Sequence, residues 1–151
     1  MDSLINKLRV LQADAFIFYT KAHGYHWNVE GILFDQFHSF FEELYQDLWD
    51  SVDTWAEWLR RLNEKASFDV MTALTTSNIK YDLGSDENNP IIMLQSLQSS
   101  NDQIISDLKE CFALASSSDE QGAANFIAER IDAHEKWRWK FKASLTSMGV
   151  N

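Results

Sequence analysis

Apolar residues recur every three or four positions along most of this 151-residue chain, which is the spacing of one face of an α-helix. The pattern predicts four long helices, over residues 2–27, 35–62, 90–115 and from 118 or 119 to at least 145. Five glycines and one proline leave few breaks in it. The chain is therefore predicted to be one all-α domain, residues 1–151, folded as a four-helix bundle. In the third helix the predicted apolar face comprises Ile92, Leu94, Leu97, Ile104, Ile105, Leu108 and Phe112.

Local signals mark the ends of these helices. The residues predicted to cap them are Asp2 or Ser3 for the first, Asn89 before Pro90 for the third, and Ser118 or Asp119 for the fourth. Gly31 breaks the pattern between the first two helices. Residues 63–89 lose long periodicity and are rich in Ser, Thr, Asn and Gly, which predicts a long crossover with one short helix near 69–75. The same composition would suit a mobile loop.

Composition and charge narrow the classes of function. A formal net charge of -10 and a pI near 4.7 argue against general binding to nucleic acid, which needs clustered Lys and Arg. An acidic surface keeps a protein soluble or attracts cations. Cys111 is the only cysteine, so no intrachain disulfide can form, and a small buried apolar residue is the favoured interpretation of it. We find no signal-peptide pattern and no apolar run near 18 residues, and predict a cytoplasmic protein without membrane contact.

Two pairs of candidate metal ligands lie on the predicted second helix. His38 and Glu42 are four residues apart, as are Asp53 and Glu57, so each pair shares one helical face, and His26 precedes the turn before this helix. His38 and Asp53 are nevertheless roughly 22 Å apart along the axis, against metal–ligand bonds near 2 Å. One chain cannot bring both pairs to a single metal. If the pairs cooperate, a second, antiparallel copy must supply the acidic pair, which creates two identical sites about a two-fold axis.

The ligand types do not name the metal, because imidazole and carboxylate together suit iron, zinc or copper. An isolated His–Glu pair on a helix is more often a surface pair than a site, but the additional ligands at matching spacing favour a metal site. His23 is a candidate further ligand or hydrogen-bond partner, with a solvent-facing or interface histidine as the alternative. His134 is interpreted as a packing residue, and the tryptophans as core residues. Trp27 is the exception, because an indole beside His26 is a candidate electron donor.

Several motifs together resemble the Dps family, the DNA-binding proteins from starved cells, also called miniferritins. The resemblance covers nearly the whole chain. The residues that carry it are His26-Trp27-Asn28, Gly31, Phe34, His38, Asp53, Ala56-Glu57, Ala115, Asp119-Glu120, His134-Glu135-Lys136 and Trp139.

This resemblance implies a ferritin-like bundle, with a short helix in the crossover between helices 2 and 3, that assembles from two-fold dimers into a hollow dodecamer. It implies oxidation of Fe(II), preferentially by hydrogen peroxide rather than O2, storage of the ferric product inside the cage, and protection against oxidative damage. The implied ligands are His26, His38 and Glu42 of one subunit with Asp53 and Glu57 of its two-fold mate. Asp119 and Glu120 are the candidate pore residues.

The chain departs from the family pattern at several positions. It has no basic N-terminal tail, so binding to DNA is not expected. Trp58 stands where the family commonly has Arg, Glu42 where many members have Asp, and residues 63–65 replace a glycine-rich turn. Two alternative functions are a non-enzymatic DNA-compacting shell and a helical bundle with a structural metal such as zinc.

Overall fold

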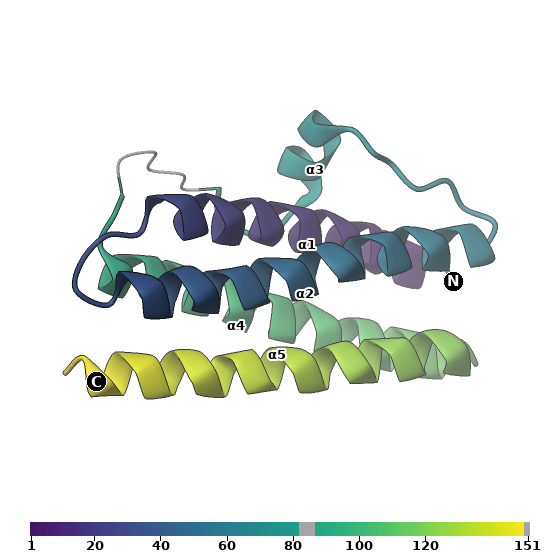
Figure 1. Cartoon of the computed structure of the whole chain (residues 1–151). Helices are drawn as coiled ribbons and strands as arrows, with labels where there is room; N and C mark the ends of the chain where they lie inside the picture. The colour runs from purple at the N-terminus through teal and green to yellow at the C-terminus, as the bar shows by residue number, and fades with distance from the viewer. Residues whose placement is uncertain (82–86, 150–151) are drawn as a thin grey trace.

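The predicted bundle is present in the computed structural model, which describes residues 1–81 and 87–149. Its helices are α1 (Asp2–Asn28), α2 (Phe34–Arg61), α3 (Val70–Thr76), α4 (Pro90–Ser117) and α5 (Gln121–Ser147) (Figure 1). There is no strand in these described ranges. The all-α prediction, the four long helices and the short helix in the crossover are all confirmed. None of the described helices is long and apolar enough to cross a membrane.

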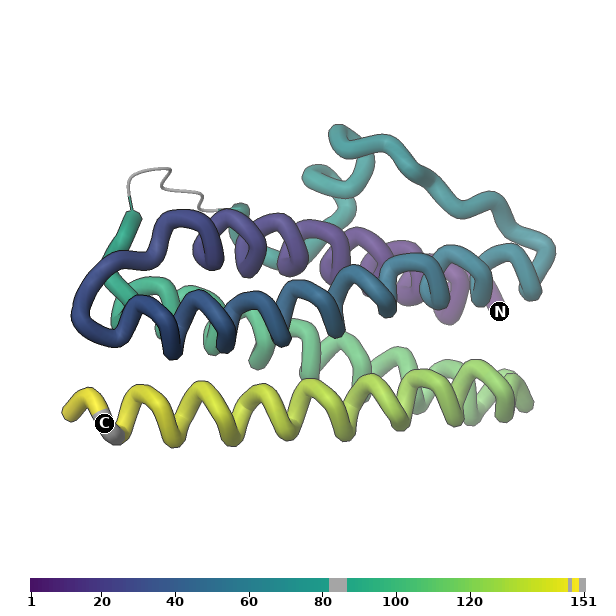
Figure 2. Tube along the Cα trace, viewed as in Figure 1, coloured from purple at the N-terminus to yellow at the C-terminus, as the bar shows by residue number. Residues whose placement is uncertain are grey.

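The crossover sets the topology of the bundle. The tube in Figure 2 runs from the end of α2 back along the molecule to the start of α4, so α2 and α4 point the same way. Two helices that follow each other in parallel cannot be joined by a tight turn, which is why a long connection is needed. Helix α3 lies outside the bundle against α1. The part of the predicted crossover at 82–86 lies outside the described residues.

The predicted caps are confirmed at some helix ends and wrong at others. Asn89 accepts a hydrogen bond from the Ile91 N–H at 2.9 Å and precedes Pro90, as predicted. Helix α1 instead starts after Met1 without a side-chain cap. Helix α5 begins at Gln121, later than predicted.

The late start of α5 has a local cause in the way α4 ends. Asp119 adopts the left-handed conformation (φ 61°), and the Glu120 N–H bonds back to the Ala115 carbonyl at 3.0 Å. This six-to-one hydrogen bond after a left-handed residue is the Schellman ending of a helix. Asn63 (φ 63°) closes α2 in the same way, and therefore takes the place of the missing glycine.

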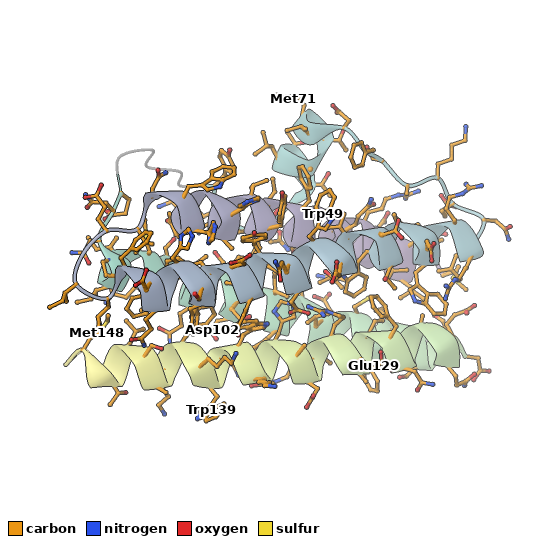
Figure 3. All side chains as sticks on the ribbon, in the orientation of Figure 1. Trp49, Met71, Asp102, Glu129, Trp139 and Met148 are labelled. Atoms are coloured by element: carbon orange, nitrogen blue, oxygen red, sulfur yellow. The ribbon has the colours of Figure 1, made fainter. Side chains whose placement is uncertain are left out.

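The core follows the predicted apolar faces with a few corrections. On α4, Ile92 and Phe112 are 48% and 39% exposed, while their neighbours Met93 and Cys111 are fully buried. Two tryptophans predicted to lie in the core, Trp49 and Trp139, are also exposed, and Figure 3 shows Trp139 pointing away from the bundle. Trp58 packs its ring against Gly122, where a Cβ would stand 2.8 Å from the indole.

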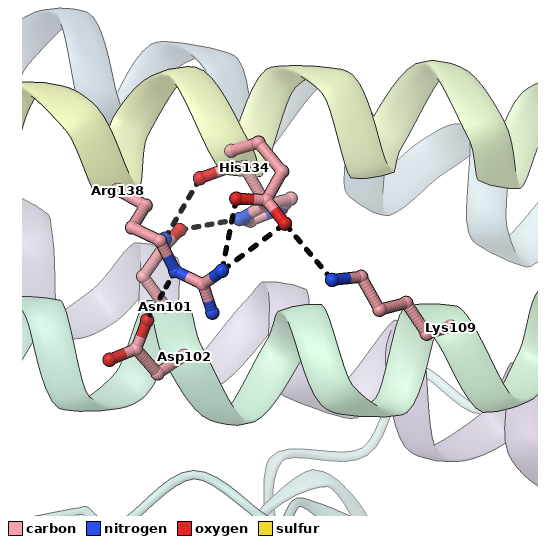
Figure 4. Close-up of polar contacts among 6 residues, drawn as sticks. Asn101, Asp102, Lys109, His134 and Arg138 are labelled. Carbon is pink, nitrogen blue, oxygen red and sulfur yellow. Dashed lines mark hydrogen bonds and ion pairs between the residues drawn. The ribbon is translucent and has the colours of Figure 1, made fainter.

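A buried polar network fixes α5 against the other helices. Arg130 forms two hydrogen bonds with the Asp47 carboxylate, at 2.8 and 3.0 Å, and the Trp137 indole N–H donates to the same group at 2.8 Å. Asn101 of α4 exchanges two hydrogen bonds with His134, one of them to the His134 carbonyl, as Figure 4 shows between the two helices. His134 is therefore a core residue, as the sequence predicted.

Candidate metal centre

His26 and His38 face each other across the turn between α1 and α2. Their rings are stacked with centroids 3.7 Å apart and an angle of 19° between the planes. The Nδ1 atom of each ring lies 2.7 Å from the backbone carbonyl oxygen of the other residue. The His26 carbonyl belongs to the last turn of α1, where carbonyls have no partner within the helix, so His38 supplies it.

These two hydrogen bonds determine the tautomer of both rings. A carbonyl oxygen can only accept, so each Nδ1 must carry a proton and donate it. A neutral imidazole then has its lone pair on Nε2, and no hydrogen bond within the described chain occupies either Nε2 atom. A histidine whose Nδ1–H is held by a carbonyl is the usual arrangement of a metal ligand, since it fixes the ring and exposes Nε2.

Glu42 lies one turn beyond His38 on α2 and is partly buried. Its Oε1 accepts a hydrogen bond of 3.2 Å from Gln46. Among the residues that the structure describes, no three His, Cys, Asp or Glu side chains converge closely enough to hold a metal ion. One chain therefore brings His26 and His38 together, but does not bring Glu42 into a three-ligand group with them.

Asp53 and Glu57 lie on the exposed side of α2, three to five turns further along. Glu57 forms an ion pair with Arg61 at 3.4 Å, and both side chains are more than half exposed. Such exposed pairs contribute little to stability. The acidic pair is thus accessible to a neighbouring molecule, and remote from His26 and His38 within its own chain.

His23 lies beside the histidine pair and is itself in contact with several rings. Its Nδ1 is 3.0 Å from the Tyr19 hydroxyl, and its ring stacks on Tyr45 at 3.9 Å and packs against Trp27 at 4.2 Å. Burial, followed by the neighbouring His26, lowers the pKa of His23, so its imidazole is neutral at pH 7. Trp27 is 66% exposed.

The predicted pore residues are at the opposite end of the bundle from the histidine pair, in the turn between α4 and α5. Asp119 is exposed and Glu120 is partly buried. Both belong to the Schellman turn described above, so their backbone geometry has a role in ending α4 whatever their side chains do.

Two tyrosines near the site were not singled out from the sequence. The Tyr45 ring meets His26 edge-on at 5.2 Å, and Tyr19 lies one turn before His23. Tyr45 is seven residues after His38 and Tyr19 is seven before His26, so both share a helical face with a candidate ligand. That spacing is the signal that could have identified them, although aromatic residues at helical spacing are usually core residues.

Comparison with known proteins places the chain in a family. The ferritin-like domain pattern matches residues 5–148. An uncharacterised protein of Haemophilus influenzae is 34% identical over 93% of this chain and 87% of its own length, and general stress protein 20U of Bacillus subtilis is 30% identical over 95% and 98%. The crystal structure of the Dps protein of Vibrio cholerae, described as a member of the ferritin-like diiron-carboxylate proteins, superposes with a TM-score of 0.90 at 28% identity, covering 95% of this chain and 89% of that one. The chain therefore belongs to the ferritin-like domain family, and it is similar to Dps proteins of that family.

Proposed function

We propose that this protein oxidises Fe(II) at sites shared between two subunits, preferentially with hydrogen peroxide, and stores the ferric product in a hollow cage that protects against oxidative damage. The observation that carries the proposal is the His26–His38 pair, whose carbonyl-bound Nδ1 atoms leave both Nε2 atoms to face a substrate metal. Fe(II) accepts both imidazole nitrogen and carboxylate oxygen as ligands. The description of the Vibrio cholerae Dps protein as a ferritin-like diiron-carboxylate protein supports a role in iron chemistry.

The ligand set of each site is completed by a second copy of the chain. Two α2 helices running antiparallel would bring Asp53 and Glu57 of each copy beside His26, His38 and Glu42 of the other, and two-fold symmetry makes both sites identical. Glu42 would exchange its hydrogen bond from Gln46 for a bond to the metal. The exposure of Asp53 and Glu57 in the single chain supports this arrangement.

Peroxide chemistry explains why two iron ions per site are useful. One hydrogen peroxide takes one electron from each of two Fe(II) ions and two protons from water, and yields two Fe(III) ions and two water molecules. Transfer of both electrons at one site avoids release of a hydroxyl radical. O2 is the alternative oxidant. The net charge of -10 attracts Fe(II), and Asp119 and Glu120 are the proposed pore residues.

Subunit complementation tests the shared site. One variant carries His38→Ala, and the other carries Asp53→Asn with Glu57→Gln; each alone should oxidise Fe(II) no faster than buffer. When both variants are unfolded, mixed in equal amounts and refolded together, half of the dimers are mixed, and each mixed dimer holds one intact site, so about a quarter of the wild-type activity should return.

The outcome separates the shared site from a site within one chain. A site within one chain would stay inactive in every mixture, since no chain then has all its ligands. Light scattering of the same samples measures the assembly, which should have a mass near 210 kDa for twelve chains of 17.5 kDa each. Wild-type activity in the His38→Ala variant would show that the histidine pair is not the site.

A further inference from the structure

Four residues connect the start of α5 with a proposed metal ligand near the end of α2, and we call them the Arg61 group: Gly122, Trp58, Arg61 and Glu57. Figure 1 shows these two helix termini at the same end of the bundle. The Trp58 indole lies against Gly122, and the Arg61 guanidinium lies over the indole with its Cζ atom 4.6 Å from the ring centroid. Arg61 Nη2 in turn lies 3.4 Å from Glu57 Oε2. The contacts therefore run without a break from α5 to a carboxylate that the proposed function assigns to the iron site of a second subunit.

The position of the Trp58 ring is set by its contact with α5. Gly122 has no side chain, and a Cβ atom there would stand 2.8 Å from the indole, which is closer than non-bonded carbon atoms approach. On the α2 side the indole is partly buried and packs against the apolar core. A ring enclosed by a close-packed core and a helix backbone has little freedom to change rotamer. The face of Trp58 is therefore a fixed surface at the end of α2.

That surface restricts the movement of Arg61. An arginine on an exposed helix face has many rotamers, and the Arg61 side chain is 54% exposed. A guanidinium over the face of an indole is attracted to the electrons of the ring, and the contact at 4.6 Å is within the usual range. A stacked guanidinium keeps its N–H groups directed outward in its own plane. Arg61 can therefore stay on the ring and donate to Glu57 at the same time.

We propose that Arg61, held on the Trp58 ring, positions the Glu57 carboxylate for Fe(II) in the site shared between two subunits. This inference rests on the proposed ferroxidase function. Glu57 Oε2 faces Arg61, and Oε1 has no hydrogen bond within the described chain, so one oxygen is held while the other is available to the metal. Arg61 acts through Glu57 without touching the iron, and is therefore a positioning residue.

Arg61 has two opposite effects on Fe(II), and their signs can be told apart. A glutamate that is already held loses less freedom when it binds the metal, which favours binding. The positive charge of Arg61 repels Fe(II), which disfavours binding. Positioning therefore predicts that loss of Arg61 weakens the binding of Fe(II), whereas charge alone predicts that the same change strengthens it.

Anaerobic titration calorimetry of the assembled protein with Fe(II), in the absence of oxidant, tests the proposal. Arg61→Gln should raise the dissociation constant of Fe(II) by about three- to tenfold, which corresponds to the cost of immobilising one flexible side chain. Arg61→Lys keeps a cation that can pair with Glu57 and should recover part of this loss. The matched control is Arg60→Gln, which removes the same charge one position away, where Arg60 donates to the Glu64 carbonyl at 2.8 Å. The control should bind Fe(II) no more weakly than wild type.

Two further variants test the part played by the ring. Trp58→Leu keeps the charge of Arg61 but removes the aromatic face, and should weaken Fe(II) binding in the same direction as Arg61→Gln. Gly122→Ala displaces the indole from α5 and should do the same to a smaller extent. In stopped-flow oxidation with peroxide, all these variants should need more Fe(II) to reach half of the maximal rate, while the maximal rate stays within about twofold of wild type, because the lost interaction is with bound Fe(II) before oxidation. Light scattering checks that each variant assembles as wild type does.

The proposal is overturned if Arg61→Gln binds Fe(II) as tightly as Arg60→Gln does, or more tightly. It is also overturned if the maximal rate falls while the dependence on Fe(II) concentration is unchanged. Measurements on wild type and Glu57→Gln separate the two levels of inference. If wild type neither binds nor oxidises Fe(II), the proposed function is wrong and the role of Arg61 is wrong with it. If Glu57→Gln weakens Fe(II) binding and Arg61→Gln does not, only the role of Arg61 is wrong.

Discussion

The protein contains two groups of histidine, around His134 and at the His26–His38 pair, that differ in how their nitrogen atoms are used. His134 is 3% exposed; its Nδ1 bonds to the Asn101 side chain at 2.7 Å, and Arg130 approaches its Nε2 at 3.4 Å. His26 is 8% exposed and uses only Nδ1, toward the carbonyl of His38. Burial alone therefore does not distinguish a structural histidine from a ligand.

The two groups differ in which of their hydrogen-bonding atoms already have a partner within the chain. The group around His134 also contains a carboxylate, Asp47, and a guanidinium, Arg130, which neutralise each other inside one chain. Burial disfavours the ionised Asp47, but the hydrogen bonds and charge of Arg130 outweigh it and lower the pKa of that carboxyl. Within the described chain, no carboxylate is hydrogen-bonded to the His26–His38 pair or completes a three-ligand group with it, and the further acidic ligands, Asp53 and Glu57, are expected from another subunit.

The largest expected effect comes from Asp47→Ala, which removes the carboxylate from the group around His134. We call this the closed group, because its charges neutralise each other inside one chain. Removal of one member of a buried ion pair leaves the other charge uncompensated, which costs about 3–5 kcal/mol. The Asp47 side chain is 29% exposed, so we expect the low end of this range, a loss of about 3 kcal/mol in the free energy of unfolding. Fe(II) oxidation by the protein that remains folded should stay within about twofold of wild type. Urea unfolding at one fixed protein concentration and stopped-flow oxidation measure the two quantities.

The matched variant is His26→Ala, at the His26–His38 pair, which we call the open pair. Here we expect a small loss of stability and a large loss of Fe(II) oxidation. Loss of its hydrogen bond to His38 costs about 1 kcal/mol. Oxidation should fall by at least about 100-fold, because even the residues that support a metal ligand are commonly worth 10- to 100-fold. If the two variants lose stability and activity in the same proportion, the distinction between a closed and an open histidine group is wrong.

The second prediction concerns the pH dependence of stability. Burial, and then the Arg130 charge, lower the pKa of His134 to about 3. In the unfolded chain this histidine takes up a proton near pH 6.5, so the stability that the neutral ring provides is fully present above 6.5 and is lost as the pH falls toward 3, at roughly 1.4 kcal/mol per pH unit. Replacement by a side chain without a charge removes this dependence.

Thermal unfolding of wild type and His134→Gln between pH 7 and pH 4 measures this pH dependence of stability. The advantage of wild type should shrink steadily as the pH falls below 6.5. Asp14 acts in the opposite direction, because burial raises the pKa of its carboxyl to about 6, so its contribution is lost as the pH rises through 6. It is present in both proteins and cancels in the comparison. A difference that stays constant across this range would show that His134 is not neutral in the core.

Sequence patterns alone predicted only part of this structure. The helices and the crossover were predictable because long apolar periodicity and the Asn89-Pro90 start are local signals. The end of α4 was not, because a left-handed Asp119 has no local signature comparable to glycine. Ile92 was misplaced because it is two residues, about 200° around the helix, from the buried Leu94, so it lies on the opposite side of α4, and Met93 is closer to the buried face.

For the candidate site, residue types and spacing predicted which residues to consider but not their geometry. The reciprocal bonds of His26 and His38 depend on how α1 packs against α2, and the sequence shows only that the residues are twelve apart. Tyr45 was overlooked because tyrosine at helical spacing normally indicates core. Trp49 was misplaced for a related reason, since its exposure depends on packing between helices.

The smallest effect is expected at Glu42, the acid nearest the histidine pair. Glu42→Asp keeps the same hard oxygen donors and shortens the side chain by one methylene, so the rate of Fe(II) oxidation should change by less than about threefold. Glu42→Gln has the same shape without the charge, and should lower the rate well beyond that range if the carboxylate binds iron. Stopped-flow rates for the two variants decide the role of this residue. Similar rates would mean that Glu42 only accepts the hydrogen bond from Gln46. The His26–His38 pair would then depend on the second subunit for all of its acidic ligands.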